Sequence, residues 1–351
     1  MLHSNKRLFH IDLVNIIAII MVLYLHSSLR VLSLPTGTKK FFCLEAIQVL
    51  GSPAVFLFFI LSGTTLLTYR SRMNTRTFFN HRFRKIVPPF LGWSVGWYIA
   101  SHYVHMPFSP FRKSLSLIDF VNSFATNNIN VIFWFFYAII GLYLVTPVLS
   151  AMIDKHKDYL FFIMILSFVT NSLIPAYMNI AHIQANYSFV QFPLITTSFV
   201  GYFIFGALFK QNYFSHKYQN WLLLLGLLSL IISLMAVVNP RLLHLLSGYN
   251  WSGYSAPLTF LYSLGLYTFL FRTSQILKPS ERAKKILKAL SGCTLGIYII
   301  HPLLYMAFTK LTGIVDGSSL YVLVFPIGAY LIGIPSIYVL QKVPIIRTLF
   351  P

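Results

Sequence analysis

Two residues that can handle protons stand far apart in the first apolar stretch of this chain, which runs from His10 to His26. Asp12 lies near the start of the stretch, and the imidazole of His26 closes it fourteen residues later. Because an α-helix rises roughly 1.5 Å per residue, about 21 Å separates the two, too far for a direct hydrogen bond. Neutral imidazole is well suited to remove a proton near pH 7. His26 therefore predicts either a general base, with covalent catalysis by the imidazole as a variant, or an interhelical hydrogen bond.

The composition places these residues in a membrane. Of the 351 residues, 57% are hydrophobic and 10% are charged, and the mean hydropathy is +0.72. A soluble domain carries roughly 25% charged residues, so the chain is predicted to cross a membrane many times. There are 27 basic and 7 acidic side chains, giving a net charge of +20. Since the cations fall in short segments between apolar ones, membrane orientation and attraction to anionic lipid explain them, and nucleic acid is not an expected partner.

Apolar segments of about 20 residues, the length that spans a bilayer, predict the fold class: an all-α integral membrane bundle of about ten transmembrane helices. With a cytoplasmic N-terminus, 20 of the 27 basic residues lie inside, which predicts that both termini are cytoplasmic. We expect a single membrane domain over residues 1–351. Cys43 and Cys293 lack ligand spacing, so neither a disulfide nor a metal site is expected. The predicted segments are 11–31, 45–68, 88–105, 130–150, 159–176, 191–209, 220–238, 254–271, 290–309 and 319–340.

Two predicted cytoplasmic segments concentrate the positive charge. The first, Arg70–Lys85, is followed by prolines at 88 and 89, which favour the first turn of a helix and predict that a helix begins there. Its cations suit phosphate groups, and a topological signal explains them equally well. The second, Arg272–Lys288, matches no motif and is interpreted as a topological signal. The cations singled out in the first segment are Arg82, Arg84 and Lys85.

Two acids are candidates to assist the chemistry. Glu45 lies at the outer start of the second segment, just across a loop from His26, and is predicted to orient or polarise the imidazole. A water-exposed carboxylate is the plain alternative. Asp12 belongs to the cytoplasmic side and is expected to pair with Arg82 or another cation there, either to position the donor entrance or simply to hold the fold.

The predicted outer loops differ from the inner ones in kind. Residues 106–129 and 176–190 are polar and nearly without acid. Their neutral hydrogen-bonding groups suit sugar hydroxyls, and ordinary solvated loops are the alternative. The residues in question are Asn122, Asn127, Asn128, Asn130, Asn179, Asn186 and Tyr187.

Five stretches, in order along the chain, resemble the acyltransferase-3 family of integral-membrane acyltransferases. Each alone is weak evidence, but together they span most of the chain. They are the run from Asp12 to His26, GSPAVFLFFILSGTTLL at 51–67, FFNHRFRKIVPPF at 78–90, FWFFYAIIGLYLVTPVL at 133–149 and LSGCTLGIYIIHPLL at 290–304. Two positions depart from the family pattern, because Asn15 and Lys85 stand where a basic residue and a second arginine are usual.

The resemblance implies a multi-pass protein of the cell membrane that moves an acyl group, an acetyl in the simplest case, from cytoplasmic acyl-CoA to a carbohydrate or lipid-linked glycan. It implies catalytic work for His26 with Asp12 and Glu45, and donor binding by Arg82, Arg84 and Lys85. Ser62, whose neighbour Gly63 permits close helix packing, is expected along the acyl path or simply in that packing.

On the acceptor side, Trp134 is expected to stack on a sugar or to sit in an aromatic belt. Tyr298 and His301, in the last motif, are expected in the active cavity. Pro302 is predicted to bend the helix there. The alternative function is a non-enzymatic exopolysaccharide export or translocation protein of the same fold, which Asn15 slightly favours. A secondary transporter is less expected, since no inverted repeat is visible.

Overall fold

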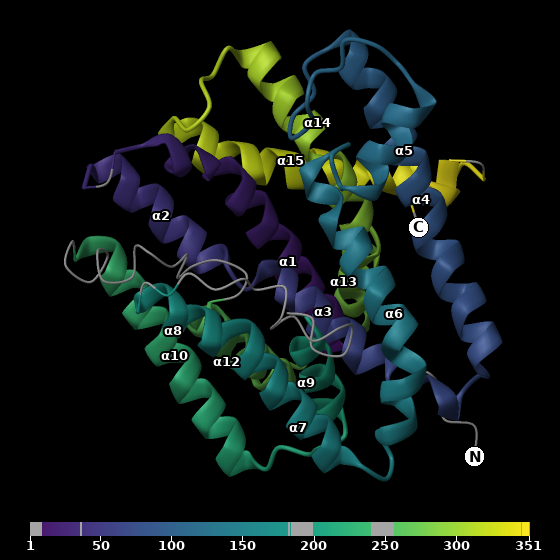
Figure 1. Cartoon of the computed structure of the whole chain (residues 1–351), viewed down its shortest axis with the longest axis vertical. Helices are drawn as coiled ribbons and strands as arrows, with labels where there is room; N and C mark the ends of the chain where they lie inside the picture. Colours follow the sequence, from purple (N-terminus) through teal and green to yellow (C-terminus); the bar gives the residue numbers. More distant parts are fainter. Residues whose placement is uncertain are drawn as a thin grey trace. The chain divides into compact units, whose positions relative to one another are not determined.

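The computed structural model describes residues 9–35, 37–181, 183, 199–239, 256–344 and 346–350. These residues form helices and connecting segments, with no strand among them (Figure 1). The chain divides into two compact units: unit 1 comprises residues 1–72 and 145–291, and unit 2 comprises residues 73–144 and 292–351. Each unit is described separately below.

Seven helical segments in the described residues are long and apolar enough to cross a membrane. This confirms a multi-pass α-helical membrane protein, while the count of about ten spans and the cytoplasmic termini stay predictions. The seven segments are Phe9–Ser33, Lys39–Ser71, Val131–Met152, Lys157–Ile180, His216–Val238, Thr294–Thr312 and Ser319–Leu340.

Unit 1 contains most of the helices (Figure 1). They are α1 (Phe9–Ser27), α2 (Lys39–Gly51), α3 (Ala54–Leu66), α7 (Lys157–Phe168), α8 (Ile174–Ile180), α9 (Val200–Lys210), α10 (His216–Val238), α12 (Pro257–Ile276) and α13 (Glu281–Gly292). A π-helical turn, Val169–Leu173, joins α7 to α8. Unit 2 contains α4 (Thr75–Tyr103), α5 (Leu117–Ala125), α14 (Thr294–Thr312) and α15 (Ser319–Leu340), and α6 (Trp134–Met152) begins in it.

Three boundaries differ from the sequence prediction. The segment expected at 45–68 is two helices, because Pro53 cannot supply the amide that would continue α2, and α3 begins at Ala54. The expected outer loop 106–129 contains the amphipathic helix α5. The residues before α14 form a separate amphipathic helix, α13, so the span predicted from 290 begins at Thr294.

The most consequential correction concerns α4. The prediction that a helix begins at Pro88 and Pro89 is wrong: α4 begins at Thr75, where the side chain of Asn74 accepts a hydrogen bond from the amide of Thr77. Each proline removes a helical hydrogen bond and crowds the turn before it, so the N-cap alone does not offset them; the remaining hydrogen bonds of this 29-residue helix carry α4 through both positions. From Thr75 onward the basic segment is therefore helical itself.

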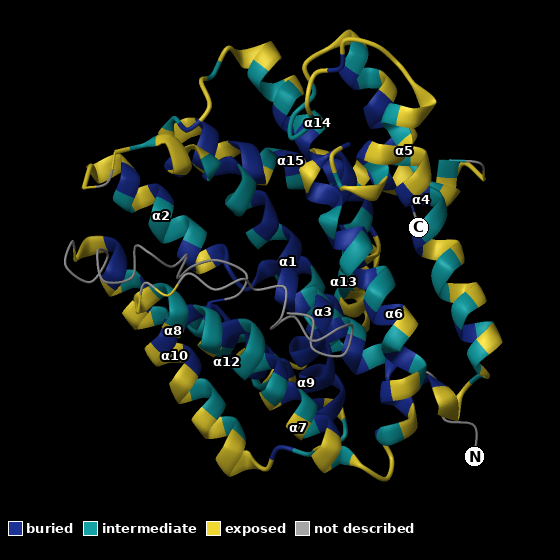
Figure 2. Cartoon of the chain, viewed as in Figure 1, coloured by how far each residue is buried: buried dark blue, intermediate teal, exposed yellow. Residues whose placement is uncertain are grey.

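Glycines bring α3 and α9 into direct backbone contact at the centre of unit 1, where both helices are buried (Figure 2). A Cβ atom added to Gly63 would lie 1.7 Å from the carbonyl oxygen of Phe203, and one added to Gly206 would lie 1.9 Å from that of Ile60. The sequence prediction that the Ser62-Gly63 pair permits close helix packing is confirmed. A second close crossing joins α10 to α12, where a Cβ on Gly226 would lie 2.7 Å from the Cα of Gly265.

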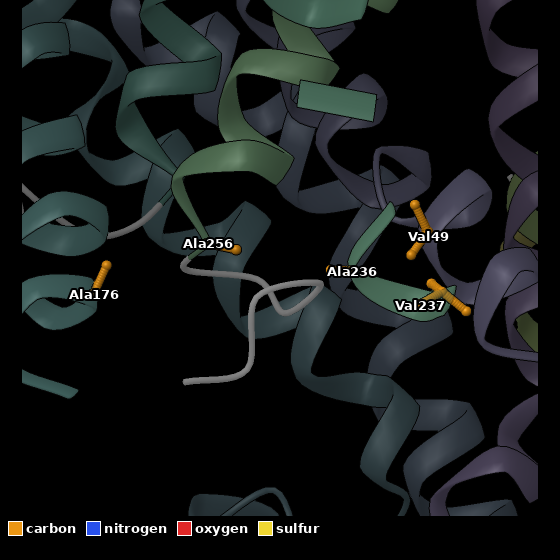
Figure 3. Packing of buried hydrophobic residues seen from close by; sticks show 5 residues of the cluster. All are labelled: Val49, Ala176, Ala236, Val237 and Ala256. Atoms are coloured by element: carbon orange, nitrogen blue, oxygen red, sulfur yellow. The ribbon is translucent and has the colours of Figure 1, made fainter. Parts of the chain in front are cut away.

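A second buried cluster in unit 1 consists of small apolar residues. They come from α2, α8, α10 and the residue before α12. The buried cluster consists of two valines and three alanines (Figure 3), with Phe42, Leu230 and Leu234 packed against it. Such small side chains let helices approach one another closely. The labelled cluster residues are Val49, Ala176, Ala236, Val237 and Ala256.

Candidate functional site

The helix α1 carries the two residues from which the chemistry was predicted. It is continuous from Phe9 to Ser27, so the estimate of about 21 Å between Asp12 and His26 holds for the folded chain. Asp12 is 4% exposed. His26, in the last turn, keeps partial exposure although its Nδ1 atom is buried. The imidazole thus stands at the end of a helix where part of the residue remains accessible.

A glutamine on α2 holds that end of α1 in place. The side-chain amide of Gln48 donates to the carbonyl oxygen of Leu25 at 2.7 Å and to the hydroxyl of Ser28 at 2.8 Å. Ser28 in turn donates to the carbonyl of Tyr24 at 2.8 Å. Because Gln48 and Glu45 are three residues apart, they share one face of α2.

Sequence reasoning missed Gln48, although a glutamine one turn beyond a candidate glutamate is a readable signal. The anchoring of α2 to the His26 end of α1 is compatible with the predicted role of Glu45, which is partly buried. Its orienting action on His26 stays a prediction.

The neutral side chain of Asn15, which stands where the resemblance leads us to expect a basic residue, has a hydrogen-bond partner in the structure. Its side-chain amide donates to the hydroxyl of Ser291, 4% exposed, at 3.0 Å. Ser291 belongs to the last of the five motifs, so this hydrogen bond joins two of the matching stretches within unit 1. The pairing of Asp12 with Arg82 joins residues of different units and stays a prediction.

His301 has a local reason for its position in α14. Pro302 has no amide hydrogen, so the carbonyl of Tyr298, four residues earlier, lacks its helical donor. The Nδ1 atom of His301 lies 2.7 Å from that carbonyl oxygen. We assign the hydrogen to Nδ1, which places the lone pair of the neutral ring on Nε2. The side chain is fully buried and stands edge-on to the ring of Tyr305, 5.9 Å away.

Tyr298 brings α14 to the beginning of α6. Its hydroxyl donates to the carbonyl of Ile132, and its ring lies 5.4 Å from that of Phe135. Trp134, partly exposed, is the first residue of α6, between these two contacts in the sequence. Trp134 therefore lies at the start of α6 beside two residues that Tyr298 contacts, and the roles of Trp134, Tyr298 and His301 toward an acceptor stay predictions.

The three cations of α4 do not form one cluster. An α-helix turns about 100° per residue, so Arg82 and Arg84 point to nearly opposite sides while Lys85 lies closer to Arg82. Arg84 and Lys85 are exposed, whereas Arg82 is partly buried with its Nε atom inside. A single phosphate cannot be held by all three, and their role in donor binding stays a prediction.

Comparison with known families decides the identity of this arrangement. The model of the acyltransferase-3 family, described as an acyltransferase domain, matches residues 9–340. The chain belongs to the acyltransferase-3 family. Searches of curated proteins and of solved structures found no match. Together with the seven apolar helices, the match identifies a multi-pass membrane acyltransferase.

In this acyltransferase the loop before α5 is tied down by a polar network. Arg112 forms an ion pair of 2.7 Å with Asp119 and donates to the carbonyl of Asn128 at 2.6 Å. The hydroxyl of Tyr98 donates to Asp119 at 2.9 Å. This hydrogen bond, together with the charge of Arg112, lowers the pKa of the Asp119 carboxyl against a smaller opposing effect of desolvation.

The asparagines of the same loop are partly committed to its structure. Asn130 is fully buried; its side chain donates to the carbonyl of Pro107 and accepts from the amide of Ile132. Asn127 adopts a left-handed backbone conformation, with φ of 54°. This loop is therefore more ordered than a solvated connection, and Asn130 serves the fold. Asn186 and Tyr187 lie outside the described residues.

Within the described part of the chain, no group of three or more His, Cys, Asp or Glu side chains is arranged to hold a metal ion. Cys43 is exposed and Cys293 is buried, each as a thiol.

Proposed function

We propose that this acyltransferase transfers an acetyl group from cytoplasmic acetyl-CoA to a hydroxyl of a cell-surface or lipid-linked carbohydrate, with His26 as general base. Membership of the family supports acyl transfer within a membrane. The proposal places the protein in the plasma membrane, with both termini cytoplasmic.

One observation carries the proposal: α1 runs without interruption from the predicted cytoplasmic side to His26. In the proposed reaction the donor is cytoplasmic and the acceptor is presented from outside, so the reacting groups meet within the membrane. Because both residues belong to one helix, the rise per residue places His26 about 21 Å beyond Asp12 along α1. That depth suits an acceptor presented from outside.

The proposed chemistry is a direct acyl transfer. The acceptor hydroxyl oxygen attacks the thioester carbonyl carbon while the imidazole of His26 takes the hydroxyl proton. The carbon–sulfur bond then breaks, and the proton passes to the departing thiolate, which leaves as coenzyme A. Glu45 orients the imidazole, and Gln48 supports this geometry by holding α2 against the carbonyl of Leu25.

The remaining site residues divide between the two substrates. Arg82, Arg84 and Lys85 attract the donor from different sides of α4 and do not form one phosphate site, and Asp12 pairs with a cation near the donor entrance. Ser62 follows the acyl path beside the α3–α9 crossing. On the acceptor side, the carbohydrate contacts Trp134, Tyr298 and His301. In support, Tyr298 of α14 bonds the carbonyl of Ile132, two residues before Trp134.

The proposal is tested with purified protein in lipid nanodiscs, supplied with acetyl-CoA and a panel of glycan acceptors. We expect coenzyme A release to depend on the acceptor and the glycan mass to increase by one acetyl group. Coenzyme A release without any acceptor dependence, or inert folded protein with the whole panel, would contradict it.

The alternative, an export or translocation protein without chemistry, is favoured by Asn15. Its amide is bonded to Ser291 and carries no charge, where the family usually has a basic residue. The two functions separate in cells that lack the chromosomal copy. If His26→Ala abolishes acylation of the exported glycan but leaves its export intact, the enzyme stands; if the substitution blocks export of an unmodified glycan, the alternative replaces it.

A further inference from the structure

Two cavities lie at one end of unit 1, where α1 begins and where α3, α9 and α12 end. The larger, about 360 Å³, is bounded by His10, Ser274, Gln275, Lys278 and Lys284. Its size falls within the range of roughly 300–1,000 Å³ that is common for small-ligand sites.

The smaller cavity, about 220 Å³, shares His10 and Gln275 with the larger one. Its other polar wall residues are Thr64, Lys210, Asn212 and Tyr267. The two spaces therefore meet at a common side chain. We call the two cavities together the His10 hollow.

The charge of the His10 hollow is positive. Lys278 and Lys284 stand on one side of His10 and Lys210 on the other, and no aspartate or glutamate is among the residues that form either wall. Glu281 pairs with Lys284 at 2.7 Å, but its own side chain is 82% exposed. Lys210 donates to the hydroxyl of Thr68 at 3.2 Å, a neutral partner that leaves its charge uncompensated.

His10 supplies the observation that points to a ligand. It is 5% exposed and lines both cavities, and its ring stands edge-on to that of Phe271, 5.1 Å away. Its Nε2 atom is buried and has no hydrogen-bond partner among the described residues. Leaving such a buried group unsatisfied is unfavourable, so a partner from outside the chain is favoured.

Neutral groups complete the walls. Gln275 and Asn212 contribute side-chain amides, and Ser274 contributes a hydroxyl that donates to the carbonyl of Phe271. Amides, imidazole and ammonium groups around one space can donate several hydrogen bonds to the oxygens of a multiply charged anion. Lys210, Lys278 and Lys284 are exposed, so a ligand can reach them from solvent, whereas His10, which lines both cavities, is buried.

We propose that the His10 hollow binds a phosphate-bearing ligand. Resting on the proposed function, the ligand is the nucleotide end of the acyl-CoA donor, whose phosphates contact Lys210, Lys278 and Lys284 and whose oxygen accepts a hydrogen bond from His10. The headgroup of an anionic phospholipid offers the same chemistry, and the experiment below separates the two sources.

The test uses the full-length protein in phosphatidylcholine nanodiscs and desulfo-coenzyme A, which carries the same phosphates but cannot transfer an acyl group. Its dissociation constant is measured by calorimetry for wild type and for Lys278→Gln/Lys284→Gln. The matched control is Lys285→Gln/Lys288→Gln, which removes two exposed lysines of α13 that line neither cavity. We expect at least a tenfold weaker binding for the first pair and less than twofold for the control.

In a second arm the protein is purified in detergent. Its melting temperature is then measured with added phosphatidylglycerol and, for comparison, with added phosphatidylcholine. If desulfo-coenzyme A does not bind wild type, but phosphatidylglycerol stabilises wild type and the control pair more than the cavity pair, the phosphate site stands and its occupant is lipid. If the two pairs of substitutions weaken binding equally, or if neither ligand acts on folded wild type, the proposed site is wrong.

The outcome is distinguishable from that of the proposed function, because desulfo-coenzyme A binding does not require transfer. Lysine-dependent binding by a protein that shows no acceptor-dependent transfer would retain the site and overturn the function. Transfer by a protein in which the cavity pair binds desulfo-coenzyme A as tightly as wild type would retain the function and overturn the site.

Discussion

His26 and His301 are both histidines in apolar helices, but their surroundings differ. At His301, the imidazole bonds the carbonyl of Tyr298, which Pro302 leaves without its helical donor; Nδ1 lies 2.7 Å from that oxygen. At His26, the neighbouring carbonyls are served by other side chains: Gln48 donates to Leu25, and Ser28 donates to Tyr24. His301 is fully buried, whereas His26 keeps partial exposure.

This difference separates a structural role from a proposed catalytic role for a histidine in a membrane helix. The imidazole of His301 bonds a carbonyl that Pro302 leaves without its helical donor, and so has a structural reason to be there. The other, His26, stands where hydroxyl and amide groups already bond the neighbouring carbonyls, and proton transfer is the role proposed for it. Substitutions at the two positions should therefore affect different measured quantities.

The largest expected effect is on turnover at His26. His26→Gln is expected to lower kcat by about 10²–10⁴-fold, the contribution of a positioned general base, with little change in melting temperature. The control is His105→Gln, which removes an exposed imidazole stacked on Phe111. If His26→Gln and His105→Gln turned over equally fast, His26 would not be the general base.

The structural role of His301 is tested by a double-mutant cycle in unfolding free energy. His301→Leu is expected to cost about 1–3 kcal/mol, because the carbonyl of Tyr298 loses its donor. In a Pro302→Ala background the new backbone amide bonds that carbonyl, so the same substitution should cost less than about 1 kcal/mol. Equal costs in both backgrounds would show that the imidazole does not bond this carbonyl.

His301→Gln should in addition raise KM for the acceptor more than it lowers kcat.

Gln48→Leu is expected to have a smaller effect on both quantities. Two hydrogen bonds to the end of α1 are lost, which should lower stability by about 1–3 kcal/mol and turnover by up to about tenfold as His26 is less firmly placed. Gln341→Leu removes a side-chain bond to the carbonyl of Gly292 in unit 2 and is the matched control. Turnover should be preserved in that control, and a turnover loss as large as that of Gln48→Leu would argue against a specific role for Gln48.

The smallest effect concerns acid stability of the α5 loop, far from either histidine in the sequence. A carboxyl whose folded pKa is lowered stabilises the fold above its unfolded pKa, near 3.8, and this stability is lost as the pH falls through the folded value. Asp119→Asn should therefore lower the melting temperature at pH 7, and the difference from wild type should shrink at pH values below 3.8. A difference independent of pH would exclude the carboxylate charge as its cause.

Much of the fold could be predicted because apolar length is a local property. Runs such as 319–340 and 220–238 read directly as helices, and α15 and α10 coincide with them closely. The position of Trp134 at a helix start was equally accessible. Prolines were misleading at 88 and 89, since a helix with a good N-cap at Asn74 can absorb them, whereas Pro53 does separate two helices.

The site was harder to predict because its parts come together only in space. Lys278 and Lys284 look like any positive-inside residues in the sequence, and only their place around His10 and opposite Lys210 gives them a shared cavity. The reverse holds for Arg82 and Arg84, which look like a cluster but diverge because the segment is helical. Adjacent charge in a sequence does not by itself make a binding site.

The central claim, that an acyl group crosses the membrane along α1 to an acceptor at His26, is tested most directly by sidedness. Protein is reconstituted in proteoliposomes of determined orientation, with acetyl-CoA on one face and a glycan acceptor on either the same or the opposite face. The account predicts acetylated glycan only when acetyl-CoA is on the face that carries the His10 hollow and the acceptor is on the other. Product that forms only when both substrates share one face would contradict it.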